Sequence, residues 1–305
     1  MSLFDLFYDG VDMSACVPAG EAVGVLNRRA AADGLHYPLC ADAAQPVGEL
    51  VLGLPFTSRS FRYGAMADNV LGMRFTLPSG QPVDVGGRVV KNVTGFELTR
   101  FLVNSGRHFG APERVVLRLR PLAEVCRVLR CTGSFERLQD FARAFLRTSW
   151  VHVVDACDAC FTGTDVAYFL EFRANAEGVA VFEKALRAVA DASGVEIAPV
   201  PELPIPPATA TVRLKTVISK AAPAAQMLVG RFGGRAHLFA GNAYLLYVPE
   251  ADAEKRPGFL QTLGELHNEA CDLGGHLETP LLAPDHADWD RRWCQELYQK
   301  WKKLD

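Results

Sequence analysis

Two cysteines, Cys157 and Cys160, have the spacing that most directly suggests chemistry in this sequence. A Cys-x-x-Cys pair can supply half of a zinc site or the two thiols of a redox-active disulfide. Zinc needs two further ligands, and His152 is the only histidine near the pair in sequence. Redox pairs of this kind open a helix, whereas this pair is predicted in a loop between strands at 151–154 and 166–172. We therefore expect incidental loop cysteines and no metal site.

A polar stretch after Pro55 carries hydroxyl groups at Thr57, Ser58 and Ser60. Such hydroxyls can hydrogen-bond a phosphate or a ribityl chain, although hydroxyl-rich loops are also common as solvated turns. The sequence leaves both interpretations of this loop open.

Three further side chains, Arg62, Tyr63 and Lys91, have the chemistry to contact an aromatic cofactor or a carboxylate substrate. Lys91 and Asn92 can equally brace the loop at 86–95 through backbone hydrogen bonds, and the two alternatives carry similar weight. No dinucleotide-binding glycine motif, phosphate-binding loop or serine nucleophile motif is present. The histidines have no triad or metal spacing, and His108 is expected to face solvent. No catalytic residue is assigned.

The elements that must position these residues lie between 61 and 121. Val70–Leu77 and Pro82–Val85 are predicted to form a β-hairpin across Pro78-Ser79-Gly80, because proline fixes φ and glycine accepts a positive φ. A short helix over 96–103 and a strand over 115–119 complete the unit.

The order of motifs in this stretch resembles the later half of the FAD-binding domain of the vanillyl-alcohol-oxidase-like (PCMH-type) flavoproteins. Within that family it is most similar to the FAD-binding subunits of bacterial glycolate oxidase. The matching residues are Arg62-Tyr63-Gly64, Asp68, Val70-Leu71-Gly72, Gly86-Gly87, Val89, Lys91-Asn92-Val93, Gly95, Phe96-Glu97, Gly106 and Gly110. The resemblance implies FAD as the cofactor. The residues expected to contact it are Gly53, Thr57, Ser58, Arg62, Tyr63, Gly64, Lys91, Asn92, Gly95, Gly106 and Gly110.

Departures from the family pattern modify that expectation. Relatives open with a strand–helix–strand unit whose glycine-rich loop holds the FAD pyrophosphate, and they continue beyond the position of Asp305. The glycine turn at 106–110 carries Arg107, His108 and Phe109 where relatives have small residues. We therefore expect a domain truncated at both ends, which binds FAD weakly or not at all in isolation.

After Pro121 the pattern restarts. Strands and helices follow in the order β-α-β-β-α-β over 124–200 and again over 208–282, which predicts two ferredoxin-like pseudo-repeats in one larger sheet. The resemblance implies a substrate-covering cap domain here. The expected fold class is α+β: a partial PCMH-type FAD-binding domain at 1–122, then a cap-like domain at 123–305. A stripe of Trp289, Trp293, Leu297 and Trp301 predicts a docking face on a terminal helix.

The composition excludes several classes of function. The formal net charge of -3 offers no electrostatic basis for nucleic-acid binding, and no apolar run reaches the length of a membrane span. Eight cysteines without a secretory signal predict a cytoplasmic protein with mostly free thiols.

Two functions of different class remain. The first is an FAD-dependent oxidoreductase subunit that oxidises a 2-hydroxy acid, as the resemblance implies. The second is a non-catalytic relative that keeps the fold and acts as a structural or interaction subunit. Under either hypothesis a partner subunit or a homo-oligomer is expected, because one edge of the FAD-binding sheet should lie open.

Overall fold

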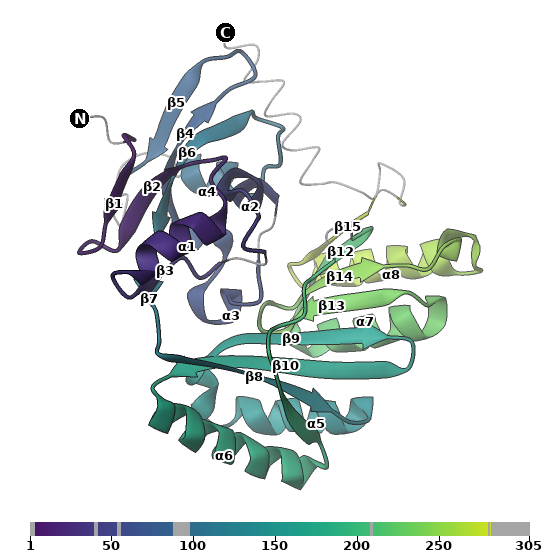
Figure 1. Ribbon diagram of the computed structural model, residues 1–305. Helices are drawn as coiled ribbons and strands as arrows, with labels where there is room; N and C mark the ends of the chain where they lie inside the picture. Colours follow the sequence, from purple (N-terminus) through teal and green to yellow (C-terminus); the bar gives the residue numbers. More distant parts are fainter. Residues whose placement is uncertain are drawn as a thin grey trace. The chain divides into compact units, whose positions relative to one another are not determined.

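A computed structural model describes residues 4–39, 42–53, 56–87, 98–207, 210–279 and 281 (Figure 1). The chain divides into two compact units, which meet between Ala123 and Glu124. Helices and strands alternate in both units, so the fold is α+β as predicted. Each unit has its own sheet and is described by itself.

The first unit is built on a five-stranded antiparallel sheet in the order β1-β2-β6-β4-β5. Its strands are β1 (Phe7–Asp9), β2 (Ser14–Pro18), β4 (Val70–Thr76), β5 (Pro82–Gly86) and β6 (Ala111–Arg118). The predicted hairpin is confirmed: β4 pairs with β5, and Gly80 has a φ of 87° in the turn between them. A separate two-stranded ladder joins β3 (Leu35–His36) to β7 (Arg120–Pro121).

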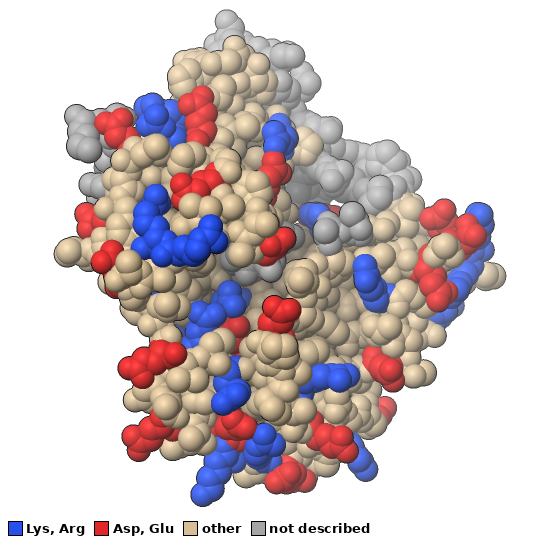
Figure 2. Space-filling model, in the orientation of Figure 1, with Lys and Arg blue, Asp and Glu red and all other residues tan. Residues whose placement is uncertain are grey.

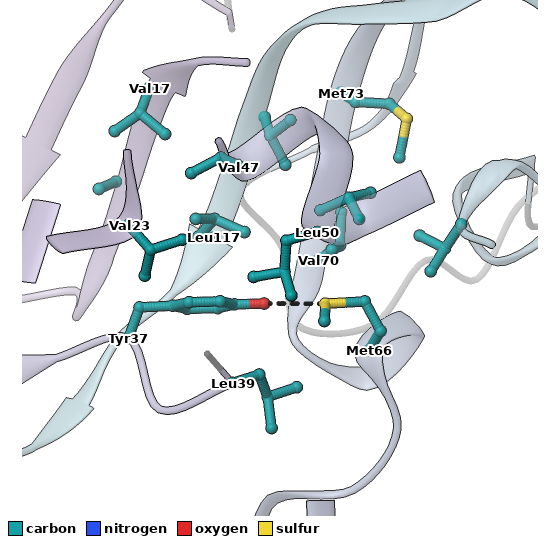
Figure 3. Packing of buried hydrophobic residues seen from close by; sticks show 14 of the residues in the cluster. Val17, Val23, Tyr37, Leu39, Val47, Leu50, Met66, Val70, Met73 and Leu117 are labelled. Atoms are coloured by element: carbon teal, nitrogen blue, oxygen red, sulfur yellow. Dashed lines mark hydrogen bonds between the residues drawn. The ribbon is translucent and has the colours of Figure 1, made fainter. Parts of the chain in front are cut away.

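Short helices cover the first sheet and close its core. They are α1 (Val23–Ala31), α2 (Val47–Gly53), α3 (Ser60–Tyr63) and α4 (Leu98–Leu102), with a 3-10 turn η1 at Met66–Asp68. In the core, the hydroxyl of the buried Tyr37 donates to the sulfur of Met66 at 3.2 Å, beside Leu50 and Val70 (Figure 3). The tyrosine hydroxyl is therefore satisfied inside an otherwise apolar cluster.

The second unit begins with a complete ferredoxin-like repeat. Its elements are β8 (Val125–Thr132), α5 (Phe135–Leu146), β9 (Val154–Thr162), β10 (Asp165–Ala174), α6 (Ala176–Ser193) and β11 (Glu196–Val200), with a 3-10 turn η2 (Ser149–Val153) before β9. The strand order is β11-β8-β10-β9. Side-chain caps begin the helices: Ser134 accepts from Arg137 N, and Asn175 accepts from Gly178 N.

A second repeat of the same order follows. It comprises β12 (Val212–Lys215), α7 (Ile218–Phe232), β13 (Arg235–Phe239), β14 (Tyr244–Val248), α8 (Phe259–Asp272) and β15 (His276–Glu278), with 3-10 turns η3 (Ala240–Asn242) and η4 (Ala253–Lys255). Its strands run in the order β13-β14-β12-β15, and β13 pairs antiparallel with β9 of the first repeat. Both repeats thus contribute their strands to one eight-stranded sheet.

The helices of the second unit that the structure describes pack on one face of this sheet. Phe161 of β9 contacts Phe135 of α5, and Phe172 of β10 contacts Phe182 of α6. Tyr247 of β14 donates to the carbonyl of Gly233 at the end of α7, and α8 packs beside α7 through Phe259. Residues at the alternating positions of these strands point to the other face. We call it the helix-free face.

One sequence prediction for an individual element is wrong. Cys157 and Cys160 lie inside β9 and not in a β–β loop, because the strand starts three residues later than predicted and runs on to Thr162. Around Gly48 the chain forms helix α2, with Val47, Leu50 and Val51 buried. Strand β12 ends at Lys215, and helix α7 begins at Ile218.

Charges of both signs are interspersed over the face of the molecule shown in Figure 2. Among the described residues, no helix combines the length and the apolar character that a bilayer crossing requires.

Candidate flavin-contacting site

The hydroxyl-rich loop of the first unit is partly a structural turn. Ser60 Oγ accepts a hydrogen bond from Thr57 N at 3.0 Å, and Ser60 N donates back to the Thr57 carbonyl at 2.9 Å. Thr57 and Ser60 are both buried, whereas Ser58 is half-buried. The Ser60 hydroxyl is therefore engaged by the backbone of the turn that precedes α3.

Helix α3 ends at Tyr63, whose ring lies close to two guanidinium groups. The Arg62 guanidinium lies 5.8 Å from the ring centroid and the Arg120 guanidinium lies 5.7 Å from it. The ring of His36, which pairs with Arg120 across the β3–β7 ladder, meets Tyr63 edge-on at 6.4 Å. Cations at this distance are attracted to the electron-rich face of an aromatic ring.

Arg59, which precedes α3, contacts the segment after β3: its Nη1 donates to the Pro38 carbonyl at 3.3 Å. Burial lowers the pKa of Arg120, and the nearby charge of Arg118 lowers it further. A bound anion would offset both effects, because it stabilises the charged guanidinium. We call Arg62 and Arg120 beside Tyr63 the arginine cluster; chemically it is suited to holding a phosphate or a carboxylate.

A glycine turn after α3 fixes the direction of Tyr63. Gly64 has a φ of 81°, and a Cβ there would lie 2.7 Å from a carboxylate oxygen of Asp68. The buried Asn69 donates to the carbonyls of Tyr63 at 2.8 Å and Ala65 at 3.1 Å, and its Oδ1 accepts from Arg120 Nη2 at 3.2 Å. Asn69 thus hydrogen-bonds both the backbone of Tyr63 and the side chain of Arg120.

The second glycine turn lies against the end of α2. Gly106 N donates to the Leu52 carbonyl at 3.2 Å, which brings Gly106 close to Gly53. The bulky residues of this turn are accommodated within the fold. Arg107 forms an ion pair with Glu49, and Phe109 is buried against Phe101 with the ring centroids 4.8 Å apart.

Gly110 at the end of the same turn has a structural role. Its φ is 122°, and a Cβ there would overlap the backbone oxygen of Thr76 in β4. His108 is exposed, as predicted.

The structure therefore brings together part of the predicted set. Arg62, Tyr63 and Gly64 lie with the Thr57–Ser60 turn, and Gly53 lies with Gly106. Lys91, Asn92 and Gly95 lie outside the described residues, as does the predicted tryptophan stripe. Sequence reasoning missed Asn69 and Arg120 as members of the site. Arg118 and Arg120, two residues apart near a strand end, were a sequence signal for a basic site. The residues that Arg120 contacts, Tyr63 and Asn69, lie more than 45 residues earlier in the chain.

Comparison with known proteins places this geometry in context. Residues 3–86 match the model of a family described as FAD binding domain. The mitochondrial cytochrome-linked D-lactate dehydrogenase of Arabidopsis thaliana is 29% identical over 137 residues, 45% of this chain and 24% of the relative. Glycolate oxidase subunit GlcD of Bacillus subtilis is 27% identical over 123 residues, 40% of this chain and 26% of the relative. The chain thus spans about a quarter of the length of these relatives.

Solved structures share the fold over nearly the whole chain. Alkyldihydroxyacetonephosphate synthase aligns with a TM-score of 0.65 at 11% identity, covering 99% of this chain and 64% of the other. A VAO-type flavoprotein of Myceliophthora thermophila aligns with a TM-score of 0.61 at 15% identity, covering 87% of this chain and 59% of the other. At such identities the likeness concerns the fold alone.

Proposed function

We propose that this chain belongs to the vanillyl-alcohol-oxidase-like FAD-binding family and is the flavin-binding part of an FAD-linked oxidoreductase of the glycolate-oxidase type. The match of residues 3–86 to an FAD binding domain and the fold shared with a VAO-type flavoprotein support this proposal. The arginine cluster is the observation that carries this proposal. Two guanidinium groups, those of Arg62 and Arg120, lie over the aromatic ring of Tyr63 at the end of α3, on the segment where the family resemblance is strongest.

The arginine cluster is proposed to hold the diphosphate of FAD. A diphosphate carries two negative charges, and guanidinium groups bind phosphate oxygens in a bidentate manner. The partly desolvated Arg120 gains most from such a partner, because burial lowers its pKa. Asn69 would hold Arg120 in position, and Gly64 would let the chain turn without a side chain beside Tyr63.

FAD, when bound, supplies the hydride acceptor for oxidation of an α-hydroxy carbon. A 2-hydroxy acid is the proposed substrate class, since the relatives include a protein named D-lactate dehydrogenase and another named glycolate oxidase subunit. The chain covers only a quarter of those relatives, so a partner subunit or a second copy is proposed to complete the cofactor site. The cytoplasm is the proposed location.

The experiment is a fluorescence titration of the purified chain with FAD and, separately, with riboflavin, which lacks the diphosphate. We expect weak FAD binding, micromolar or weaker. Arg120→Gln should weaken FAD binding by about tenfold, which corresponds to about 1.4 kcal/mol, and should leave riboflavin binding unchanged. Arg74→Gln is the matched control, because Arg74 pairs with Asp84 on β5 at 2.8 Å and lies outside the cluster.

Three outcomes would count against this assignment. Equal losses of FAD affinity in Arg120→Gln and Arg74→Gln would show that the arginine cluster does not bind the diphosphate. Equal losses of FAD and riboflavin affinity would point to a contact with the ring system instead. Undetectable FAD binding at millimolar concentration would favour the alternative, a non-catalytic relative that acts as a structural or interaction subunit.

A further inference from the structure

Three chemically reactive side chains meet at the seam between the two ferredoxin-like repeats. Asp158 and Cys160 are two residues apart on β9, so both point to the helix-free face. His237 of β13 lies directly opposite Cys160 in the ladder that joins the repeats. Each repeat thus contributes to one cluster, and the cluster lies entirely within the second unit.

The contacts place the imidazole between the carboxylate and the thiol. His237 Nε2 lies 3.1 Å from Asp158 Oδ2, and His237 Nδ1 lies 3.6 Å from Cys160 Sγ. Asp158 is fully buried and His237 is 3% exposed, whereas Cys160 is partly exposed. Among the three, the thiol is therefore the group that solvent and small reagents reach.

The surroundings favour a protonated imidazole. Burial by itself would lower the pKa of His237, but the charge of Asp158 and the hydrogen bonds to Asp158 and Cys160 raise it to about 10. A protonated ring donates at both nitrogens, one to the carboxylate and one to the sulfur. An imidazolium beside a cysteine favours the thiolate form, which is the nucleophilic form of the residue.

The neighbouring strands β10 and β14 place no charged side chain directly opposite these three residues. Opposite Cys160 and Asp158 on β10 stand Ala167 and Phe169, and opposite His237 on β14 stands Leu246, all uncharged. Phe239 packs against the His237 ring at 4.9 Å, and it pairs with Tyr244 of β14.

Charged groups on the same face lie further along the strands. Arg235 lies two residues before His237 on β13 and is exposed. Glu171 and Asp155 pair with Arg173 at 3.3 and 3.5 Å toward the other end of β9.

Two other uses of these residues do not fit the geometry. A metal ion would need convergent ligands, but Asp158 and Cys160 occupy opposite sides of the His237 ring. The described part of the chain holds no group of three His, Cys, Asp or Glu residues that could bind a metal. A disulfide with Cys157 is also unsuitable, because Cys157 points to the opposite face, where burial raises the pKa of its thiol.

We propose that Cys160, His237 and Asp158 form a thiolate–imidazolium–carboxylate triad that makes Cys160 a reactive site for hydroperoxides. In the reaction, the thiolate sulfur attacks one peroxide oxygen and a sulfur–oxygen bond forms as the oxygen–oxygen bond breaks. The sulfur is oxidised by two electrons to sulfenic acid, and the peroxide is reduced, with hydroxide leaving. A thiol such as glutathione can reverse the modification through a mixed disulfide.

The first test measures the reactivity of each cysteine in the full chain. Native protein is treated with iodoacetamide at pH 6, and with hydrogen peroxide followed by a sulfenic-acid probe, and labelling is quantified by peptide mass spectrometry. We expect Cys160 to react at least tenfold faster than Cys271. Cys271 is the control because it is exposed and also lies near a histidine, with Sγ 3.7 Å from His267 Nε2. A slower Cys160 would overturn the proposal.

The second test distinguishes activation of Cys160 by the triad from simple solvent exposure of its thiol. His237→Gln and Asp158→Asn should each slow Cys160 labelling at least tenfold at pH 6, while Cys271 labelling stays constant. Unchanged Cys160 rates in these variants would overturn the proposal.

The pH profile of the unsubstituted protein gives an answer even where a variant fails to fold. A Cys160 rate nearly constant between pH 6 and 8 supports the thiolate. A rate that rises about tenfold per pH unit over that range, as for an ordinary thiol, contradicts it. None of these readouts depends on FAD, so the proposed function can fail independently.

Discussion

Gly110 and Gly80 both have positive φ angles, 122° and 87°, but only Gly110 lies against another backbone segment. An alanine at Gly80 would meet no atom within 4 Å, so Gly80→Ala should cost about 1–2 kcal/mol for the unfavourable backbone conformation. Gly110→Ala should cost more, about 3 kcal/mol or above, because its Cβ would overlap the Thr76 backbone oxygen. Urea unfolding of the two variants checks this difference, and equal losses would contradict the close approach.

The buried pair of His237 and Asp158 predicts a dependence of stability on pH. The pKa of His237 is about 10 in the folded chain against an ordinary value of 6.5. The pair therefore makes its full contribution to the free energy of unfolding below about pH 6.5. This contribution falls as the pH rises toward 10, by at most about 1.4 kcal/mol per pH unit. Asp158→Asn should flatten this slope between pH 7 and 10. Denaturant unfolding at several pH values measures it, and an unchanged slope would refute the assignment.

At the scale of elements, the turn after α3 depends on one buried side chain. Asn69→Ala removes a donor to the Tyr63 carbonyl and the acceptor of Arg120 Nη2, while the Ala65 carbonyl keeps the hydrogen bond from Asp68 N at 3.0 Å. An unsatisfied buried polar group costs about 1–3 kcal/mol, so we expect a loss of that size in the free energy of unfolding. Asn175→Ala, which removes a helix cap in the second unit, is the control for general destabilisation.

Asn69→Ala should also weaken FAD binding, because Tyr63 and Arg120 both lose their hydrogen bonds to the Asn69 side chain. Asn175→Ala should destabilise by about 1 kcal/mol and leave FAD affinity unchanged. An equal loss of FAD affinity in both variants would show that Asn69 acts through overall stability alone.

At the scale of the whole molecule, two compact units meeting between Ala123 and Glu124 predict two protease-resistant fragments. Limited proteolysis should cut first near that junction or in the proline-rich link at 199–207, which joins the two repeats. Mass spectrometry of the earliest fragments identifies the cleavage points. First cuts inside the β4–β5 hairpin or inside β9 would argue against two separate folding units.

Much of the fold was predictable from the sequence, because local patterns specify it. Pro78-Ser79-Gly80 specifies the turn of the β4–β5 hairpin, since the needed φ angles belong to proline and glycine. The apolar stripes of α5 and α6 and the capping residues Ser134 and Asn175 mark the helices of the first repeat. Repetition of the same element order was enough to predict the eight-stranded sheet.

The tertiary structure alone decided which side chains meet. Cys160 and His237 are 77 residues apart and become neighbours only through the register of β9 on β13. A shift of one residue in that register would turn His237 to the helix face. Arg120 reaches Tyr63 in the same way, through the β3–β7 ladder and Asn69. The sequence by itself therefore determined the elements and the family resemblance, whereas long-range strand pairing decided the contacts, because that pairing depends on the packing of the whole unit.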